Sequence, residues 1–439
     1  MRPLARASAP THRPSSAARS GIPVVSAVLA SALLLTACAG SAGGGGGGGA
    51  AGEGFAHGAP QEEVDALLAD LDPVTLTYQP AAAGPNSIMA PEARAFAEEI
   101  EERSGGRITL DIVWGQAIAG YTEIPNALAD GRLDISYALP IYMPAEFPSY
   151  DAAATALNGV RNSPFLGEIV YNAVSADIGW QNTGLLEEYA AEGASALNPM
   201  ISSGGYYMVC RDPGSAPEDW AGRQVRIAST AHHAVVEALG ASPVSMEYVE
   251  VYEALQRGTV DCSLAELLPT AESSLPEVAP YITYVDDATS FSSRAVGAML
   301  AGPSFDALPL PYRQIVFDAG QTQLAGMTGI VMDGTAASMA GAKEHGGAVE
   351  AMDPASAEII RTTNAELTAG VVSDGLLGDD VEARIDESEE HWATSAEALG
   401  LTDTGAPEDF DTWYDPGAVD LDPFAAEVFE HAFLAHRPE

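Results

Sequence analysis

Lysine is nearly absent from this 439-residue chain, in which Lys343 is the only one among 19 basic residues. Acidic residues number 62, and the formal net charge is −43. This excess of negative charge repels phosphate backbones and anionic lipid, so we exclude nucleic acid as a partner. We attribute the acidity itself to solubility or to adaptation to salt. Any anionic ligand must be held by a local arginine, although salt screens the long-range field beyond ~10 Å.

Cysteine is also scarce, with three residues in the whole chain. Cys38 lies near the N-terminus, which leaves Cys210 and Cys262 in two predicted strands. We expect two buried free thiols, with a disulfide as the alternative because the chain is predicted to be exported. No Cys-x-x-Cys motif occurs, and the adjacent His232 and His233 point to different sides of a helix. We therefore predict no metal site and no other cofactor.

Long apolar runs are missing too, because no segment reaches 18 uninterrupted apolar residues. The run 22–35 is too short to span a bilayer as a mature helix, and it follows four arginines, as in a signal peptide. It ends in Leu-Thr-Ala before Cys38, the spacing of a bacterial lipoprotein signal. We predict that residues 1–37 are removed and that lipidated Cys38 anchors the protein to the outer face of the cell membrane. An ordinary secretory signal is the alternative.

Glycine, by contrast, is abundant after this signal. Gly43 to Gly49 are consecutive, and such a stretch cannot build a core. We predict that residues 38–71 contain the lipidated cysteine and a flexible tether. Four of the 19 basic residues and none of the 62 acidic ones lie in 1–37, so the rest of the chain carries a charge of −47. About 370 residues follow the tether, which is enough for two hydrophobic cores.

One segment occurs twice. Residues 123–136 and 250–263 share six identical positions at a constant offset of 127. Both copies are typical of the end of a helix, a glycine in the left-handed conformation and then a buried strand. These glycines are Gly131 and Gly258. A supersecondary unit that returns about a domain's length later indicates two similar α/β lobes.

Each lobe is predicted to have the order β-α-β-α-β, which implies parallel strands with right-handed crossovers. In lobe one, we predict strands at 74–78, 107–114 and 133–139, and helices at 91–104 and before Gly131. In lobe two, we predict strands at 224–228, 243–246 and 259–264, and helices at 230–239 and 249–257. Elsewhere the patterns predict helix at 162–200, crossing strands at 206–211 and 291–300, and long helices at 311–343 and 354–376.

These elements predict a two-lobed α/β fold with a ligand cleft between the lobes and long C-terminal helices. Lobe one is assigned residues 72–203 with part of 286–330, lobe two 204–285 with part of 331–400, and an acidic extension 401–439. Ligands of open α/β sheets bind beyond the carboxyl ends of the strands. We therefore place the cleft at the loops after Tyr78, Trp114, Leu139, Ala228, Met246 and Leu264, with hinges where the chain crosses between lobes.

Four linked motifs add a family resemblance. Residues 104–116 contain Ser-Gly-Gly-Arg-Ile and then Trp-Gly-Gln, and residues 127–148 contain Ala-Leu-x-x-Gly-x-Leu-Asp and then Pro-x-x-Phe-Pro. Residues 217–227 read Pro-Glu-Asp-Trp-Ala-Gly-Arg-Gln-Val-Arg-Ile, the most specific of the four, and residues 239–261 continue the pattern. In order and spacing these motifs resemble the solute-binding proteins of TRAP transporters, the DctP family. The resemblance covers about 72 to at least 330.

The resemblance implies a periplasmic-binding-protein-like fold, no enzymatic activity and a small-molecule carboxylate ligand. It also implies the small and large membrane subunits of a TRAP permease as partners, driven by an ion gradient. Carried onto this sequence, it makes Arg226 the residue that pairs with the ligand carboxylate, which suits the bidentate geometry of a guanidinium. The alternative is an ion pair between Arg226 and an acid inside lobe two. Arg223, in the preceding loop, is expected to be a solvated surface charge.

Several positions depart from the sialic-acid-type members of the family. Tyr207 stands where they have an arginine, Ala265 where they have an asparagine, and Leu139 where they have an acidic residue. Tyr137 and Tyr248 match aromatic positions that line the ligand. One carboxylate anchor therefore remains among apolar and aromatic groups, which favours a monocarboxylate with an apolar or aromatic body over a C4-dicarboxylate.

Other polar residues are the alternative if the loops are displaced relative to the family. Gln79, Gln116 or Glu266 would then supply polar contacts to the ligand. Because the register of the crossing strand is uncertain, Arg211 or Arg294 could supply a second cation.

Three functions are compatible with a two-lobed exported protein of this composition. A receptor that delivers an organic acid to a TRAP permease is favoured. The receptor of an ATP-driven importer would share the two-lobed cleft, and the linked motifs argue against it. An exported hydrolase would need a nucleophile with a base, and the chain has no G-x-S-x-G motif.

Overall fold

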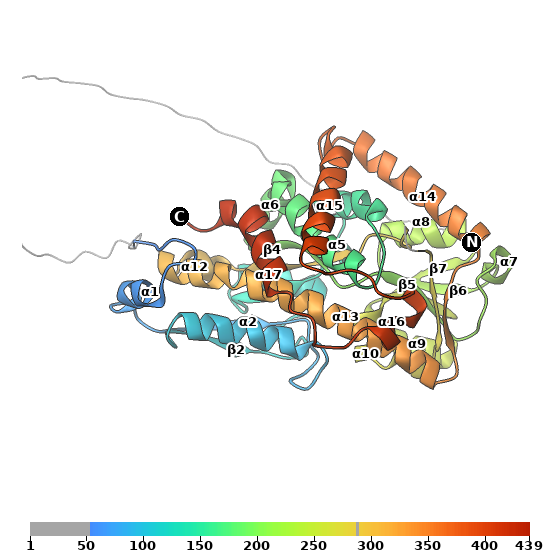
Figure 1. Ribbon diagram of the computed structural model, residues 1–439, viewed down its shortest axis with the longest axis horizontal. Coiled ribbons are helices and arrows are strands. Elements are labelled where there is room, and N and C mark those ends of the chain that lie inside the picture. The colour runs from blue at the N-terminus through green and yellow to red at the C-terminus, as the bar shows by residue number, and fades with distance from the viewer. Residues whose placement is uncertain (1–52, 287–288) are drawn as a thin grey trace, which may run out of the picture. The chain divides into compact units, whose positions relative to one another are not determined.

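Two separate mixed β-sheets organise the chain (Figure 1). This computed structural model describes residues 53–286 and 289–439. The predicted signal peptide, the lipidated Cys38 and the glycine run lie outside the described residues. Within the described ranges, no helix is both long enough and apolar enough to cross a membrane.

The first sheet, which we call the sheet of lobe one, has the strand order β2-β1-β3-β10-β4. Its β1, β2 and β3 are parallel, and β10 is antiparallel to both β3 and β4. The strands are β1 Val74–Gln79, β2 Ile108–Ile112, β3 Ile135–Ala138, β4 Ser195–Ser202 and β10 Ala295–Ala301.

The second sheet, that of lobe two, has the order β11-β9-β5-β8-β6-β7. Here β6, β7 and β8 are parallel, and β5 is antiparallel to β8 and β9. The strands are β5 Tyr206–Cys210, β6 Gln224–Ile227, β7 Ser242–Ser245, β8 Cys262–Glu266, β9 Tyr281–Tyr284 and β11 Ala348–Ala351. Each sheet thus contains the predicted β-α-β-α-β unit, and the predicted fold class is confirmed.

Helices flank these sheets. Those up to the second crossing are α1 Gln61–Leu68, α2 Ala90–Arg103, α3 Ile124–Ala129, α4 Pro148–Ala156, α5 Leu166–Gln181, α6 Thr183–Ala191, α7 Pro217–Trp220, α8 Thr230–Ala238, α9 Val251–Arg257 and α10 Leu267–Glu272. Those beyond it are α11 Pro303–Asp306, α12 Leu310–Asp318, α13 Gly320–Glu344, α14 Pro354–Ser373, α15 Val381–Ala398, α16 Phe410–Trp413 and α17 Asp422–Val428.

The repeated segment forms the same turn in both lobes. Gly131 and Gly258 end their helices with φ of +76° and +71°, the left-handed conformation that glycine adopts without a steric penalty. After each glycine an aspartate carboxylate accepts from the backbone N–H of a neighbouring strand: Asp134 from Thr77 at 2.7 Å, and Asp261 from Gln224 at 2.8 Å. The repeat therefore fixes how the third strand of each lobe joins the first, as the two-lobe prediction requires.

The predicted helix at 162–200 is wrong at its C-terminal end. Helices α5 and α6 occupy its first part, but residues 195–202 form β4, which pairs only with β10 at the edge of the lobe-one sheet. Pro199 is tolerated there because an edge strand can leave a position without a ladder hydrogen bond. The chain then crosses at residues 203–205 into β5, and crosses back between β9 and β10.

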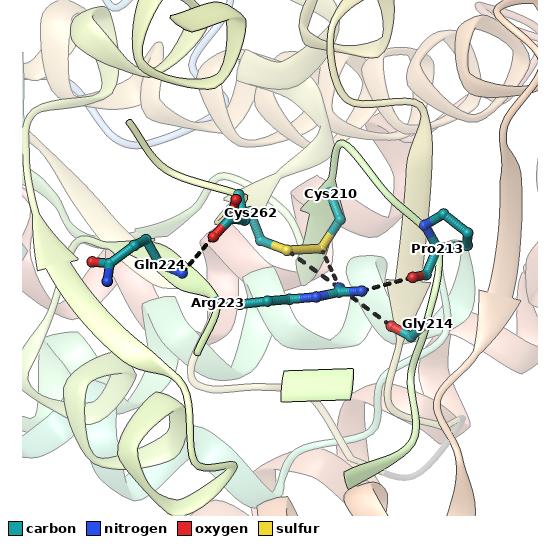
Figure 2. The surroundings of a disulfide bond; sticks show 7 residues. Cys210, Pro213, Gly214, Arg223, Gln224 and Cys262 are labelled. Carbon is teal, nitrogen blue, oxygen red and sulfur yellow. Dashed lines mark hydrogen bonds between the residues drawn. A yellow bond between two sulfur atoms is a disulfide. The ribbon is translucent and has the colours of Figure 1, made fainter. Parts of the chain in front are cut away.

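Cys210 and Cys262 form a disulfide, so the expectation of two free thiols is wrong (Figure 2). The two cysteines are directly opposite each other in the antiparallel pair of β5 and β8, with their Cα atoms 4.1 Å apart. Arg223 is not a solvated surface charge either, because its Nη1 lies 3.5 Å from Cys210 Sγ and its Nη2 donates to the Pro213 carbonyl at 2.6 Å. Its position against the disulfide follows from a long-range strand pairing that the local pattern does not contain.

The acidic C-terminal segment, from α15 to the last residue, packs against the rest of the fold. Helices α15 and α17 contact α5, and α13 contacts α16 and α17. Ser388 donates to the Asp177 carboxylate on α5 at 2.7 Å. At the end of α13, the Lys343 ammonium lies 2.6 Å from Asp411 and 3.7 Å from Asp409. The only lysine of the chain therefore binds this acidic segment to the end of α13.

Candidate ligand-binding cavity between the two sheets

A cavity of about 420 Å³ lies at the carboxyl ends of the parallel strands of both sheets. All six loops selected from the sequence contribute to its wall: Ala81 and Ala83, Gly115 and Gln116, Leu139, Ile141 and Tyr142, Ala228, Tyr248 and Val249, and Glu266 and Pro269. The remaining lining residues come from helices, strands and the crossings: Met89, Tyr121, Tyr137, Ser203, Tyr206, Arg226, Tyr252, Glu272, Ser273, Val296 and Met327. A volume of this size suits a small organic molecule.

Aromatic rings dominate the wall, with six tyrosines among the lining residues. Burial raises the pKa of Tyr137 and Tyr248, so their hydroxyls stay protonated over the physiological range. The Tyr137 hydroxyl forms a 2.8 Å hydrogen bond with Ser203 at the crossing, and the Tyr248 hydroxyl contacts Ser273 at 3.2 Å. Because these hydroxyls are bonded to the protein, the rings offer mainly flat apolar surface to a ligand.

Arg226 is the only basic residue in the lining of the cavity, and it is buried. It lies on β6, and its guanidinium stacks over the Tyr248 ring at 5.3 Å. Within the described part of the chain, no carboxylate oxygen lies within 4.0 Å of this guanidinium. The alternative of an ion pair inside lobe two is therefore not what the structure shows. A buried cation without a counter-ion is costly unless a partner arrives.

The hydrogen bonds of Arg226 leave room for that partner. Its Nε donates to the Met246 carbonyl at 3.0 Å and its Nη1 to the Leu264 carbonyl at 3.2 Å. Its Nη2 donates to the Tyr142 hydroxyl at 3.3 Å. A guanidinium has five N–H donors, so one N–H remains on each terminal nitrogen. A carboxylate accepts from such a pair side by side.

Glu266 lies at the end of β8, where it lines the same cavity and is 6% exposed. Burial raises the pKa of Glu266, while a hydrogen bond with Tyr206 and the charge of Arg226 act in the opposite direction. The pairing of β5 with β8 places Tyr206 directly opposite Glu266. The cavity therefore contains an acidic group and a basic group that are close enough to interact but not ion-paired.

Gln116 reaches the cavity through a strained turn. It has φ of +57°, one of two positive-φ positions without glycine in the described chain, and it follows Gly115 at +70°. A Cβ at Gly115 would lie 2.8 Å from the Ala83 carbonyl oxygen, which requires glycine there. Strained backbone of this kind concentrates at functional sites. Gln116 lines the cavity together with Tyr121.

Two predicted site residues lie outside the lining. Gln79 is buried in lobe one, where its amide donates to the Ala119 carbonyl at 2.8 Å and accepts from the Ile118 amide at 3.0 Å. Tyr207 is also buried away from the cavity, because successive side chains of a strand point to opposite faces and its neighbour Tyr206 lines the wall. Tyr137, Tyr248, Gln116, Glu266 and Arg226 do come together.

Neither alternative second cation reaches the cavity. Arg294 forms a buried ion pair with Glu168 at 3.1 Å, close to the crossing, and Arg211 is not part of the lining. Sequence reasoning missed Tyr121, Tyr142, Tyr206 and Glu272, which line the wall. Tyr142 follows a predicted rim strand and could have been found there, whereas Tyr206 needed a register one residue different from the one chosen.

The two lobes also contact each other directly through polar groups. Tyr142 of lobe one accepts from Arg226 of lobe two, as described above. The Ile88 amide donates to the Glu272 carboxylate at 3.1 Å, and the Thr230 hydroxyl lies 3.2 Å from both carboxylate oxygens of Asp151. No group of three or more potential metal ligands occurs in residues 53–286 and 289–439. The residues that line the cavity come from both lobes.

Residues 81–373, about two thirds of the chain, match the family model of the bacterial extracellular solute-binding proteins, family 7, known as DctP. The chain belongs to this family. Members of this family are solute-binding receptors, so this DctP-family chain is a receptor rather than an enzyme, and the hydrolase alternative is overturned. The recognition made from its motifs is confirmed.

Curated relatives and solved structures agree with this assignment. A solute-binding protein of Albidiferax ferrireducens is 25% identical over 227 residues, which cover 52% of this chain and 64% of the relative. The chain spans 37% to 66% of the length of five curated relatives that it matches.

Two solved structures share the fold at a TM-score of 0.60. The first is the sugar acid binding protein DctPAm from Advenella mimigardefordensis in complex with galactonate, 20% identical and covering 73% of this chain and 99% of its own. The second is a TRAP solute-binding protein from Rhodoferax ferrireducens with copurified benzoate, 21% identical and covering 72% and 99%. At these identities the likeness establishes the fold alone.

Proposed function

We propose that this receptor binds an organic acid with a single carboxylate and an apolar or aromatic body, and delivers it to a TRAP-type secondary transporter. The observation that carries the proposal is the buried Arg226 guanidinium, which has no acidic partner and keeps one N–H on each terminal nitrogen. A ligand carboxylate would supply both the counter-charge and the two missing acceptors.

The rest of the wall supports one carboxylate rather than two. Arg226 is the single cation in the lining, and the other charged lining residues, Glu266 and Glu272, are acidic. A second buried carboxylate would lack a cation, which is costly. The galactonate and benzoate bound by the two fold neighbours also carry one carboxylate each.

The transport setting rests on family membership and on the N-terminal sequence. A DctP-family receptor works with the small and large membrane subunits of a TRAP permease. The motif before Cys38 supports a lipid anchor on the outer face of the cell membrane, with the glycine run as a tether. No observation favours an ATP-driven importer over this arrangement.

Calorimetry with benzoate and other monocarboxylic acids on the wild type and on Arg226→Ala and Arg226→Lys tests the proposal. Loss of a desolvated charge pair costs about 2–5 kcal/mol, so we expect affinity to fall about 30-fold or more in both variants. Arg257→Ala is the matched control, because Arg257 is exposed and pairs with Glu253 at the surface of the same lobe. Unchanged affinity in both Arg226 variants would remove the carboxylate from this position.

A further inference from the structure

The cavity presents a buried basic residue and a buried acidic residue that do not form an ion pair with each other. Arg226 and Glu266 both line the wall, and neither is more than 6% exposed. Among the described residues, neither has an ion-pair partner within 4.0 Å. A ligand whose only charged group is a carboxylate would neutralise Arg226. Glu266 would then face the uncharged part of the ligand without a counter-charge.

The strand pairing fixes where these two groups stand. β8 lies between β5 and β6, with Ser263 opposite Arg226 on one side and Tyr206 opposite Glu266 on the other. Four residues along the same strand pair, the disulfide joins Cys210 to Cys262 and prevents β5 from slipping past β8. Since residues two and four apart share a face of a strand, the disulfide holds Tyr206 and Glu266 side by side at the cavity.

Resting on the proposed function, we propose that the ligand is a zwitterion whose carboxylate binds Arg226 and whose protonated amine binds Glu266. Its apolar or aromatic body then lies against the tyrosine rings. Tyr206, directly opposite Glu266 in the pairing of β5 with β8, lines the same wall beside that carboxylate. Glu266 is thereby a specificity-determining residue, which selects amine-bearing acids from acids of the same shape without the amine.

A protonated amine is a better partner for Glu266 than a hydroxyl, for two reasons. An ammonium brings the positive charge that an ionised buried carboxylate needs, whereas a hydroxyl brings only a hydrogen bond. A zwitterion also has no net charge, so the −47 charge of the chain beyond residue 37 does not repel it on approach as it repels an anion. The second acid of the wall, Glu272, is already engaged by the Ile88 amide across the cavity.

Matched pairs of probes test the proposal on the folded receptor. Phenylalanine and 3-phenylpropanoate differ only by the amine, as do leucine and 4-methylpentanoate, and proline and cyclopentanecarboxylate differ by the ring nitrogen. Calorimetry should give at least about 10-fold tighter binding for the amine-bearing member of the best-bound pair, the effect of one charge-assisted hydrogen bond. In Glu266→Gln that preference should shrink to within about 3-fold, while the acid without the amine keeps its affinity.

Two further variants test whether the preference for the amine comes from Glu266 itself. Glu218→Gln removes one negative charge from the surface of lobe two and should keep the preference, because Glu218 is exposed on α7. Loss of the preference in Glu272→Gln, with the preference retained in Glu266→Gln, would assign the role to the other acid of the wall and overturn the proposal. If Glu266→Gln does not fold, Tyr206→Phe removes only the hydroxyl of the residue opposite Glu266 and should reduce the same preference.

The outcomes distinguish this inference from the proposed function. If acids without the amine bind as tightly as their amine-bearing partners, and do so only when Arg226 is present, the zwitterion is overturned and the acid receptor stands. If amine-bearing acids bind better but Glu266→Gln and Tyr206→Phe keep the preference, Glu266 is not its source. If no member of any pair binds, both proposals fail.

Discussion

The two lobes place different chemistry at equivalent positions of the same scaffold. Asp134 and Asp261 make the same bond to the first strand of their lobes, through the amides of Thr77 and Gln224. Two residues after each of these amides lie Gln79 in lobe one and Arg226 in lobe two. Five residues after each aspartate lie Leu139 and Glu266. Lobe one therefore has an amide and an apolar residue where lobe two has a cation and an acid.

This difference gives the two lobes different roles: the polar residue of lobe one stabilises its own fold, whereas the charged residue of lobe two is available to a ligand. The side-chain amide of Gln79 forms hydrogen bonds with backbone groups of its own lobe, whereas Arg226 retains two N–H donors for a ligand. Both charged groups that the proposals assign to the ligand thus belong to lobe two, and lobe one contributes Tyr121, Tyr137 and Tyr142. We infer that the polar end of the ligand binds lobe two and that lobe one then covers the apolar body.

Glu92 is one of the buried acids of lobe one, and the pH dependence that it gives to the stability of the protein is the largest effect we expect. Glu92 on α2 is 7% exposed, and burial raises its pKa from 4.5 to about 8. The folded state therefore holds a proton that the unfolded state releases above about pH 4.5. The stability that this proton provides is complete below pH 4.5 and is lost as pH rises to about 8, by up to about 5 kcal/mol.

Glu92→Gln keeps the shape and removes the titration. Urea denaturation of the wild type and the variant from pH 4.5 to 8.5 measures the difference in their free energies of unfolding. We expect the variant to gain stability relative to the wild type as pH rises, with the difference levelling off above pH 8. A difference that does not change with pH would mean that Glu92 is not buried as a neutral acid.

The next largest effect that we expect on stability comes from the buried ion pair beside the first crossing between the lobes. Arg294 and Glu168 are 1% and 2% exposed and lie 3.1 Å apart, and Glu168 also accepts from Ser202 at 2.8 Å, next to the first crossing. Arg294→Met leaves Glu168 buried without its counter-ion, which should cost about 3–5 kcal/mol of stability. Arg226→Met, with no acid left unpaired, should cost no more than about 1–2 kcal/mol for its lost hydrogen bonds.

Chemical denaturation of both single variants and of the Arg294→Met, Glu168→Met double variant makes this comparison. Removing both charges should recover most of the loss, because no unpaired charge remains in the interior. Equal losses for the two arginines would contradict the distinction between a structural and a ligand-facing guanidinium.

The sequence predicts much of this scaffold because its signals are local. The glycine turns at Gly131 and Gly258 and the alternating strands before and after them depend on neighbouring residues only. The site was predicted at the level of loops for the same reason: parallel strands place their carboxyl ends at one edge. Arg226 was identified through a motif whose order and spacing are specific.

What remained hidden depends on contacts between distant segments. β4 pairs with β10, about a hundred residues later in the chain, and no local pattern separates it from the helix before it. The disulfide and the position of Tyr206 both depend on the register of β5 against β8. A register one residue away would exchange Tyr206 for Tyr207 at the cavity, so the pairing decides which tyrosine lines the wall.

The smallest effect tests the shared scaffold itself. Asp134→Ala and Asp261→Ala each remove a charged acceptor from a backbone N–H at 2.7 or 2.8 Å, and both aspartates are partly exposed. We expect each to lower the free energy of unfolding by about 1–2 kcal/mol, with the two values within about 0.5 kcal/mol of each other. The asparagine variants, which keep an acceptor, should lose less.

The two sites belong to different sheets and share no partner, so the double alanine variant should show the sum of the two losses. Losses that differ by more than about 1 kcal/mol would mean that the repeat is not energetically equivalent in the two lobes.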